Sequence, residues 1–271
     1  MISFICPVCG LPLEDRGSLY CCKNRHSFDK SRYGYVNLLL SNQSSKKHHG
    51  DDRLMVRARK DFLSKGYYGF LLSRLSELCH SYLNPNACIL DAGCGECYYS
   101  CGILADNPGF DFAGIDISKD ALEYAAKRGA EFPLAVAGVF DMPFADNSFG
   151  CVINCFSPNA EKEYARVLKS GGILLRVVPL EDHLFSLKAV IYDKPYLNEK
   201  PQNDISLLKL SDYAEIRKTL IIENKEDISN LFKMTPYYYK TGAEDQNKVL
   251  DISRLETEAA FGIFIYTKEK E

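Results

Sequence analysis

The feature that most constrains the fold of this chain is a short apolar run that leads directly into a glycine-containing turn. Residues 87–92 (ACILDA) predict a buried strand, Gly93-Cys94-Gly95 follows at once, and a helical stretch covers 98–106. Glycines at this place allow a bound ligand to approach the backbone closely. The segment therefore predicts a strand–turn–helix unit that holds a ligand at the end of its strand.

Strands and helices alternate after this unit. Further short apolar runs predict strands over 111–116, 134–138, 150–156 and 172–178, with helical segments between them over 118–129 and 161–169. Such alternation requires right-handed crossovers and predicts an α/β fold with a mostly parallel, doubly wound sheet. Beyond Pro179 the pattern predicts helices over 182–192, 226–233 and 247–258 and strands over 216–222 and 261–267.

We expect three zones along the chain. Residues 1–40 are rich in turns, cysteine and aromatic side chains, and they predict a small zinc-binding ribbon. The polar segment 41–52 predicts a linker. From Arg53 onward apolar residues recur three or four apart, which predicts two helices broken near Gly66 at the start of a domain that covers 53–271.

Charge divides the chain in a similar way. The net charge is −3, but the first 70 residues hold 12 Lys/Arg against 6 Asp/Glu, and the remainder hold 21 against 30. The basic region predicts an anionic partner. Basic side chains alternate there with aromatic ones that can stack on unpaired bases, which favours nucleic acid; the alternative is a small aromatic core with solvated charges. These residues are Lys23, Arg25, Lys30 and Arg32 with Tyr20, Phe28, Tyr33 and Tyr35.

Cysteine usage points to metal binding rather than to disulfides. The chain has 11 cysteines, its N-terminus lacks the pattern of a signal peptide, and no stretch is apolar for long enough to span a membrane. We therefore expect a cytoplasmic protein with no membrane partner, in which thiols stay reduced and clustered cysteines bind metal.

The N-terminal cysteines have the spacing of a zinc site. A CxxC pair, Cys6 and Cys9, is followed after twelve residues by Cys22 and His26, and these four ligand types suit tetrahedral Zn²⁺. Cys21 competes for the third position, but Cys22 gives the shorter turn to His26. The alternatives are reduced structural cysteines with a chance histidine, or a redox CxxC.

Acidic residues after the next two strands complete the predicted ligand site. Asp116 lies 21 residues after Gly95 at the end of a strand, where a carboxylate can accept hydrogen bonds from both hydroxyls of a ribose. Asp141 and Met142 follow the third strand. A nicotinamide dehydrogenase shares this arrangement but requires GxGxxG, and Gly95 is followed here by Glu96-Cys97-Tyr98.

The runs ILDAGCGE, GIDIS and DMPFADNSFGCVI resemble the class I S-adenosylmethionine-dependent methyltransferases. The resemblance implies a Rossmann-like sheet, S-adenosylmethionine as cofactor and S-adenosylhomocysteine as product, with Asp91, Gly93 and Cys94 in the cofactor turn. One departure is Cys97, which stands where most members have a third glycine. We expect its side chain to narrow the pocket around the methionine end of the cofactor.

Segments outside these motifs resemble a narrower family, the bacterial 23S rRNA (guanine-N1)-methyltransferases. They are the CPxC…CxxxH ribbon, RYGYVNLL, the pattern DxxxMxxARxxFLxxGYY and MTPYYY. The resemblance implies that the zinc ribbon helps to recognise an RNA hairpin loop, that one of two nearby guanines is methylated at N1, that one of these choices contributes to macrolide resistance, and that the protein is a homodimer. It carries the zinc ligands over to Cys6, Cys9, Cys22 and His26, and cofactor contacts over to Tyr68, Gly95, Glu96 and His183.

The sequence names no catalytic base. Asn154 or Ser157 is a candidate for contacting the edge of the base, with loop capping as the alternative, and the segment 234–237 is either a lid or part of the core. Two other functions compete with the leading one. The first is a small-molecule methyltransferase of the quinone or metabolite type, which the run DMPFADNSFG also fits. The second is a non-catalytic RNA-binding relative, with which the departure at Cys97 is compatible.

Overall fold

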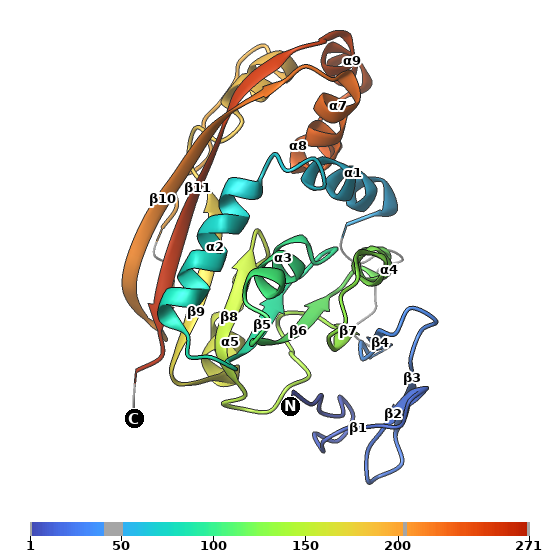
Figure 1. Ribbon diagram of the computed structural model, residues 1–271. Coiled ribbons are helices and arrows are strands. Elements are labelled where there is room, and N and C mark those ends of the chain that lie inside the picture. The colour runs from blue at the N-terminus through green and yellow to red at the C-terminus, as the bar shows by residue number, and fades with distance from the viewer. Residues whose placement is uncertain (1, 41–50, 203–204, 270–271) are drawn as a thin grey trace.

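The computed structural model describes residues 2–40, 51–202 and 205–269, and these form an eight-stranded sheet with a small three-stranded sheet beside it (Figure 1). The large sheet has the order β10-β11-β9-β8-β5-β6-β7-β4. Its strands are β4 (Val36–Asn37), β5 (Cys88–Ala92), β6 (Asp111–Asp116), β7 (Leu134–Val136), β8 (Phe149–Cys155), β9 (Leu168–Pro179), β10 (Lys209–Ile222) and β11 (Leu255–Thr267).

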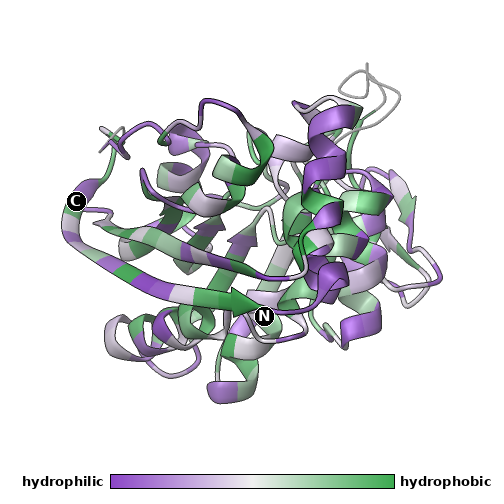
Figure 2. Cartoon of the chain, turned by 90° about the horizontal axis from the view of Figure 1, so that it is seen from above, coloured by the Kyte–Doolittle hydropathy of each residue, from purple (hydrophilic) through white to green (hydrophobic). Residues whose placement is uncertain are grey.

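The helices connect and cover these strands. They are α1 (Arg53–Leu63), α2 (Gly69–Tyr82), α3 (Tyr98–Asp106), α4 (Lys119–Arg128), α5 (Glu161–Val167), α6 (Phe185–Ile191), α7 (Lys225–Lys233), α8 (Pro236–Tyr239) and α9 (Ala243–Asp251). In Figure 2 the helices show both green and purple residues, as amphipathic helices that cover a sheet do. The predicted break near Gly66 is confirmed: α1 ends at Leu63, and Gly66 has a φ of 79° before α2 begins.

Pairing in the large sheet is parallel from β4 to β9 and antiparallel from β9 to β10. After β5 the chain builds outward through β6 and β7, then returns to the other side of β5 with β8. The strand order therefore reverses between β5 and β8, and open α/β sheets bind ligands at the carboxyl ends of the strands at such a point. The predicted mostly parallel, doubly wound α/β fold is confirmed.

Alternate residues of the central strands enter different cores, which explains why these strands are apolar on both faces. Ile89 packs in a core with α2 and α3, whereas its neighbour Leu90 packs in a core with α5. The second core also contains Phe4, whose ring centroid lies 5.2 Å from that of Phe144. The N-terminal segment and the large sheet therefore share hydrophobic contacts.

The N-terminal residues fold as a ribbon held against one edge of the large sheet. The ribbon strands are β1 (Glu14–Asp15), β2 (Leu19–Cys21) and β3 (Ser27–Asp29), and β4 then pairs in parallel with β7. A backbone hydrogen bond from Ile5 N to Pro143 O, 2.9 Å long, adds a second connection. The boundaries at 40 and 53 stay a prediction, and most of the predicted linker, residues 41–50, lies outside the described residues.

The prediction of a helix over 247–258 is wrong in its second half. Helix α9 ends at Asp251, and Leu255 already belongs to β11. The reason is long-range pairing: β11 runs beside β10 from Leu255 to Thr267 and also pairs with β9. Such pairing outweighs local helical periodicity. The helices in the described parts of the chain are too short or too polar to cross a membrane.

Candidate cofactor and metal sites

The four predicted zinc ligands meet at the edge of the ribbon. One potential ligand atom from each of Cys6, Cys9, Cys22 and His26 lies within 4.8 Å of the other three. Cys6 and Cys9 come from the turn before β1, and Cys22 and His26 flank the turn between β2 and β3. Cys21 does not compete, because its thiol donates to the carbonyl oxygen of Cys22 at 3.3 Å.

Distances inside this cluster fit a tetrahedral zinc ion. Cys9 Sγ and Cys22 Sγ are 3.7 Å apart, and His26 Nδ1 lies 3.4 Å from Cys6 Sγ and 3.5 Å from Cys22 Sγ. With Zn–S near 2.3 Å and Zn–N near 2.05 Å, tetrahedral edges would be about 3.8 Å for sulfur–sulfur and about 3.6 Å for sulfur–nitrogen. Four protein ligands leave no open position, so zinc in this cluster supports the fold rather than catalysis.

The cofactor turn is built around Asp116 at the carboxyl end of β6. Its two carboxylate oxygens accept backbone N–H groups from Gly95 and Ser118, each at 2.8 Å. Gly95 has a φ of 55° in this turn. Asp116 therefore fixes the turn after β5 and still has oxygen lone pairs for other donors, since a carboxylate accepts about four hydrogen bonds.

Gly93 is required where the turn meets the loop after β8. It has a φ of 90°, and a Cβ added there would lie 2.3 Å from Ser157 Oγ. Asp91, buried at the end of β5, accepts a hydrogen bond from Ser100 of α3. Burial raises the pKa of Asp91 to about 7, although the Ser100 hydroxyl opposes this shift. A cationic ligand near Asp91 would favour its ionised form.

The side chains of Cys94 and Cys97 are part of the core. A Cβ added to Gly114 of β6 would lie 3.0 Å from Cys94 Sγ, so Cys94 packs against that strand. Cys97 is fully buried in the same small cluster as Leu122 and Ala125 of α4. The expectation that Cys97 narrows the cofactor pocket stays a prediction, and its burial in this cluster shows that the side chain also packs beside α4.

Glu96 is buried and paired with a cation. Its carboxylate bonds Arg128 of α4, and the same guanidinium donates to Ser64 Oγ at 3.3 Å. The other carboxylate oxygen, Oε1, is buried with no hydrogen-bond partner among the described residues. Glu96 thus connects the cofactor turn to the end of α1 and retains one acceptor for a ligand.

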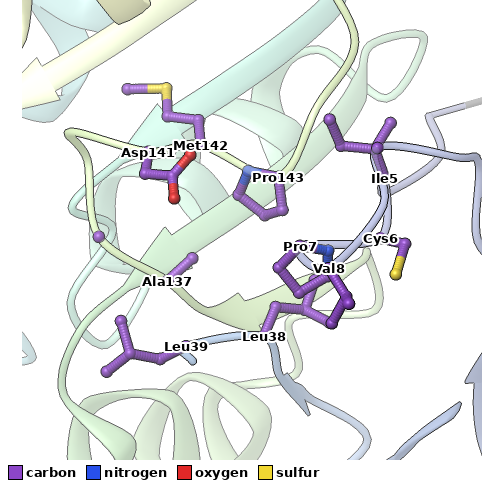
Figure 3. Close-up of a pocket in the computed structure, with 12 residues that line it drawn as sticks. Ile5, Cys6, Pro7, Val8, Leu38, Leu39, Ala137, Asp141, Met142 and Pro143 are labelled. Atoms are coloured by element: carbon purple, nitrogen blue, oxygen red, sulfur yellow. The ribbon is translucent and has the colours of Figure 1, made fainter. Parts of the chain in front are cut away.

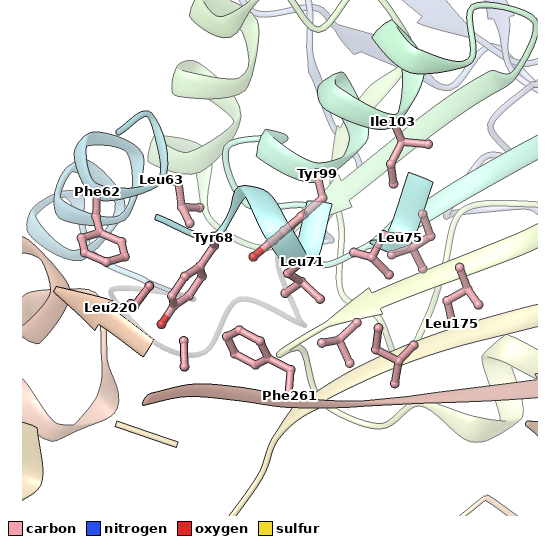
Figure 4. Packing of buried hydrophobic residues seen from close by; sticks show 14 of the residues in the cluster. Phe62, Leu63, Tyr68, Leu71, Leu75, Tyr99, Ile103, Leu175, Leu220 and Phe261 are labelled. Atoms are coloured by element: carbon pink, nitrogen blue, oxygen red, sulfur yellow. The ribbon is translucent and has the colours of Figure 1, made fainter. Parts of the chain in front are cut away.

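Tyr68 and His183 meet in an aromatic cluster around Phe261 of β11 (Figure 4 shows Tyr68 and Phe261). The ring of Phe261 lies 5.1 Å from that of Tyr68 and 4.7 Å from that of His183. Tyr99 of α3 belongs to the same core. The hydroxyls of Tyr68 and Tyr99 are buried without a hydrogen-bond partner in the described chain, so a polar ligand in this region would satisfy them.

The structure determines which nitrogen of His183 can donate. Its Nδ1 accepts the backbone N–H of Ala260 at 3.1 Å, so the proton of the neutral ring is on Nε2. Burial, with a smaller contribution from Lys188, lowers the pKa of His183 to about 3. His183 is therefore a neutral hydrogen-bond donor at physiological pH.

Asp141 and Met142 lie where the ribbon meets the large sheet. They line a cavity of about 190 Å³ together with the Cys6–Pro7 turn and Leu38 (Figure 3). Asp141 is exposed. The backbone N–H of Met142 already has a partner, because it donates to Glu163 of α5 at 2.6 Å. Of the two predicted residues, Asp141 is thus the better placed to contact a ligand.

Other candidate residues have structural roles. Asn154 is fully buried and donates to Pro158 O and Tyr164 Oη, so it ties the loop after β8 to α5 without capping that helix. Its Oδ1 has no hydrogen-bond partner among the described residues, and a contact with the base edge stays a prediction. Tyr237 packs beside the cation of Lys188, 5.1 Å from its ring centre, and Tyr239 donates to Asp52 at 2.6 Å. The segment 234–237 and its neighbour Tyr239 therefore join α6 to the start of α1.

Sequence reasoning missed Lys188. It is completely buried on α6, and its ammonium donates to Tyr196 O at 3.0 Å and to Asn198 Oδ1 at 2.6 Å. Burial lowers its pKa. The available signal was a lone charge in the apolar run FSLKAVI, since a lysine in such a run must find buried partners.

The chain matches the family model for the N-terminal domain of RlmA over residues 4–47 and a methyltransferase domain over residues 90–176. YxjB of Bacillus subtilis (strain 168), named as a 23S rRNA (guanine-N1)-methyltransferase, is 36% identical over 205 residues, which are 71% of this chain and 70% of YxjB. The chain belongs to the 23S rRNA (guanine-N1)-methyltransferase family. The 23S rRNA (guanine(748)-N1)-methyltransferase of Streptomyces fradiae is 35% identical over 67% of this chain and 65% of its own length.

A solved structure supports the fold. The YcgJ protein of Bacillus subtilis superimposes with a TM-score of 0.51 and 17% identity over 74% of this chain and 98% of its own. The class I methyltransferase fold with an N-terminal zinc ribbon, expected for this methyltransferase family from the sequence, is confirmed. S-adenosylmethionine and zinc are likewise confirmed at the level of these two domains, whereas the individual cofactor contacts stay predictions.

Two variants separate the two roles of His183, the predicted contact with the cofactor and the hydrogen bond that its Nδ1 accepts from Ala260 N–H. His183→Ala should weaken binding of S-adenosylhomocysteine about tenfold and lower the stability by about 1–3 kcal/mol, because Ala260 N–H loses its acceptor. His183→Asn keeps an acceptor near Nδ1, so it should lose affinity but retain stability. Calorimetry and thermal unfolding measure the two effects; wild-type affinity in both variants would refute the assignment.

Proposed function

We propose that this protein transfers a methyl group from S-adenosylmethionine to N1 of one guanine in a 23S rRNA hairpin loop, and that the zinc ribbon and basic N-terminal region bind the RNA. One observation carries the proposal: the ribbon packs against the same sheet edge as the predicted cofactor residue Asp141. The Cys6–Pro7 turn and Asp141 line one cavity. A macromolecule bound by the ribbon would therefore lie beside the predicted cofactor site.

Charges on the ribbon support an RNA partner. Lys23, Arg25 and Arg32 are exposed, as phosphate contacts require. Tyr20 and Tyr35 are buried, Tyr20 in the core that the ribbon shares with the large sheet and Tyr35 in a cluster with α4 and β7, so both pack in cores rather than serve as stacking platforms. The basic charges, more than the aromatic residues, thus favour the RNA interpretation over a small-molecule substrate.

The chemistry mainly requires positioning. When bound, S-adenosylmethionine supplies an electrophilic methyl group, and the protein must hold guanine N1 in line with it. Guanine N1 also carries a proton that must leave. A pKa of about 3 makes His183 too weak a base for this step, so we assign it to holding the cofactor through Nε2.

The test uses tritiated cofactor, zinc-loaded protein and 23S rRNA transcripts, followed by primer extension. We expect label in the RNA and a reverse-transcription stop at one guanine, because N1 methylation blocks Watson–Crick pairing. Label in a small metabolite and none in RNA would contradict the proposal in favour of the quinone-type alternative. RNA binding without transfer would identify a non-catalytic relative.

We also propose that the enzyme works as a homodimer. This assembly is implied by the family resemblance, and light scattering on the purified protein measures it directly. A mass near 30.6 kDa at micromolar concentration would contradict it.

A further inference from the structure

Phe156, the residue that follows β8, combines a strained backbone with an exposed aromatic ring. Its φ is 60°, and its side chain is 47% exposed. The left-handed conformation costs a non-glycine residue about 1–2 kcal/mol. Because the ring is exposed, burial of its apolar surface offsets little of this conformational cost. Phenylalanine at this position therefore adds little to the stability of the fold.

Two buried side chains hold the loop in this conformation. Asn154 Nδ2 and Tyr164 Oη both donate to the carbonyl oxygen of Pro158, at 3.1 and 2.7 Å, and both residues are fully buried. Phe156 N donates to Val177 O of β9 at 3.2 Å. Strain that is maintained by surrounding structure in this way is characteristic of functional sites.

The loop places Phe156 at the predicted cofactor site. The side chain of the next residue, Ser157, fills the space where a Cβ on Gly93 would lie. The ring of Phe156 lies 5.3 Å from that of Phe261, which in turn contacts Tyr68 and His183. Phe156 is therefore the exposed end of an aromatic cluster that contains two predicted cofactor residues.

We propose that the exposed ring of Phe156 stacks on the target guanine once that base has left the RNA stack, and so holds N1 near the methyl group. This inference rests on the proposed function. A base that undergoes chemistry must be unstacked from its neighbours, and an aromatic side chain replaces the lost stacking. The ring contacts the face of the base and leaves its Watson–Crick edge open for the reaction.

Substitutions of Phe156 test the role of the ring face. Stacking contributes about 1–3 kcal/mol per base, so Phe156→Ala should lower kcat/KM for the RNA about 5- to 150-fold. Phe156→Leu keeps apolar bulk without a π face and should be similarly impaired, whereas Phe156→Tyr should stay within about threefold of the wild type. Wild-type activity in the leucine variant would overturn the inference.

Phe156→Gly separates stacking from backbone strain. Glycine adopts a positive φ without cost, so this variant should unfold at or above the wild-type temperature and still be as inactive as Phe156→Ala. Full activity in the glycine variant would contradict a role for the ring. Tyr82→Ala is the matched control: it removes the ring of a 42% exposed tyrosine at the end of α2, where the hydroxyl donates to Asp212 of β10 at 3.2 Å, and should leave kcat/KM unchanged.

A binding measurement reports stacking directly. In a hairpin with 2-aminopurine at the target position, wild-type protein should quench the extruded base, and Phe156→Leu should leave it brighter. Affinity for S-adenosylhomocysteine should change less than twofold in all Phe156 variants. A wild-type protein that methylates no RNA overturns the proposed function and the stacking with it; an active wild type with a normal leucine variant overturns the stacking alone.

Discussion

Cys22→Ser should abolish zinc binding and unfold the ribbon. Structural zinc contributes an apparent binding free energy of about 10–16 kcal/mol, and a segment of some forty residues buries too little apolar surface to replace it. Cys21→Ser is the matched control, because Cys21 lies next to the cluster but bonds only a backbone carbonyl among its described contacts. Zinc content by mass spectrometry and thermal unfolding measure the two outcomes.

The effect of zinc loss should extend beyond the ribbon. Phe4 packs on Phe144 in the core of the large sheet, and β4 pairs with β7. A chelator should therefore lower the unfolding temperature of the whole protein and weaken binding of S-adenosylhomocysteine, since Asp141 lies beside the Cys6 turn. Stoichiometric zinc in Cys22→Ser, or cofactor affinity that does not respond to chelation, would contradict this expectation.

Asp116→Ala should weaken cofactor binding at least on the order of a hundredfold. Two of the carboxylate lone pairs hold Gly95 and Ser118, and the others are available for two ribose hydroxyls. Hydrogen bonds to a charged group contribute about 1.5–3 kcal/mol each, and the variant also leaves two backbone N–H groups without acceptors. Titration calorimetry with S-adenosylhomocysteine measures the change, and Asp111→Asn, at the other end of β6, is the control.

Acid should reproduce part of this loss. Burial raises the pKa of Asp116 above that of an exposed aspartate, although Ser118 and Gly95 oppose the shift. The protonated carboxyl accepts fewer hydrogen bonds, so the affinity for S-adenosylhomocysteine should decrease as the pH is lowered. This decrease should begin at a higher pH than it would with an exposed aspartate. Affinity in Asp116→Ala should lack this component. A decrease in affinity on acidification that is equal in both proteins would argue against Asp116.

His183 adds a stability effect at low pH. Its pKa is lowered from 6.5 to about 3 in the folded protein, so the unfolded chain binds more protons between these values. Stability should therefore decrease as the pH falls from about 6.5 toward 3. Above pH 7 this residue contributes no pH dependence, because it is neutral in both states.

Local patterns predicted much of the fold and the metal cluster. Strands β5, β6 and β8 follow from short apolar runs, and the turn at Gly93 and Gly95 from glycine itself. The CxxC and CxxxH spacings predicted which four residues meet, because each pair is brought together by one tight turn. Helix α9 was predicted too long, because pairing with distant strands determines where β11 begins.

The sequence by itself thus determined what depends on neighbours along the chain: the strand–turn–helix unit, the zinc knuckles and the family motifs. Only the tertiary structure decided what depends on contacts between distant residues. It placed Glu96 against Arg128, bonded Asn154 to the loop after β8, buried Lys188 beside two tyrosine rings, and left Phe156 strained and exposed. The physical reason is that burial and hydrogen-bond partners are properties of packing, which no local spacing contains.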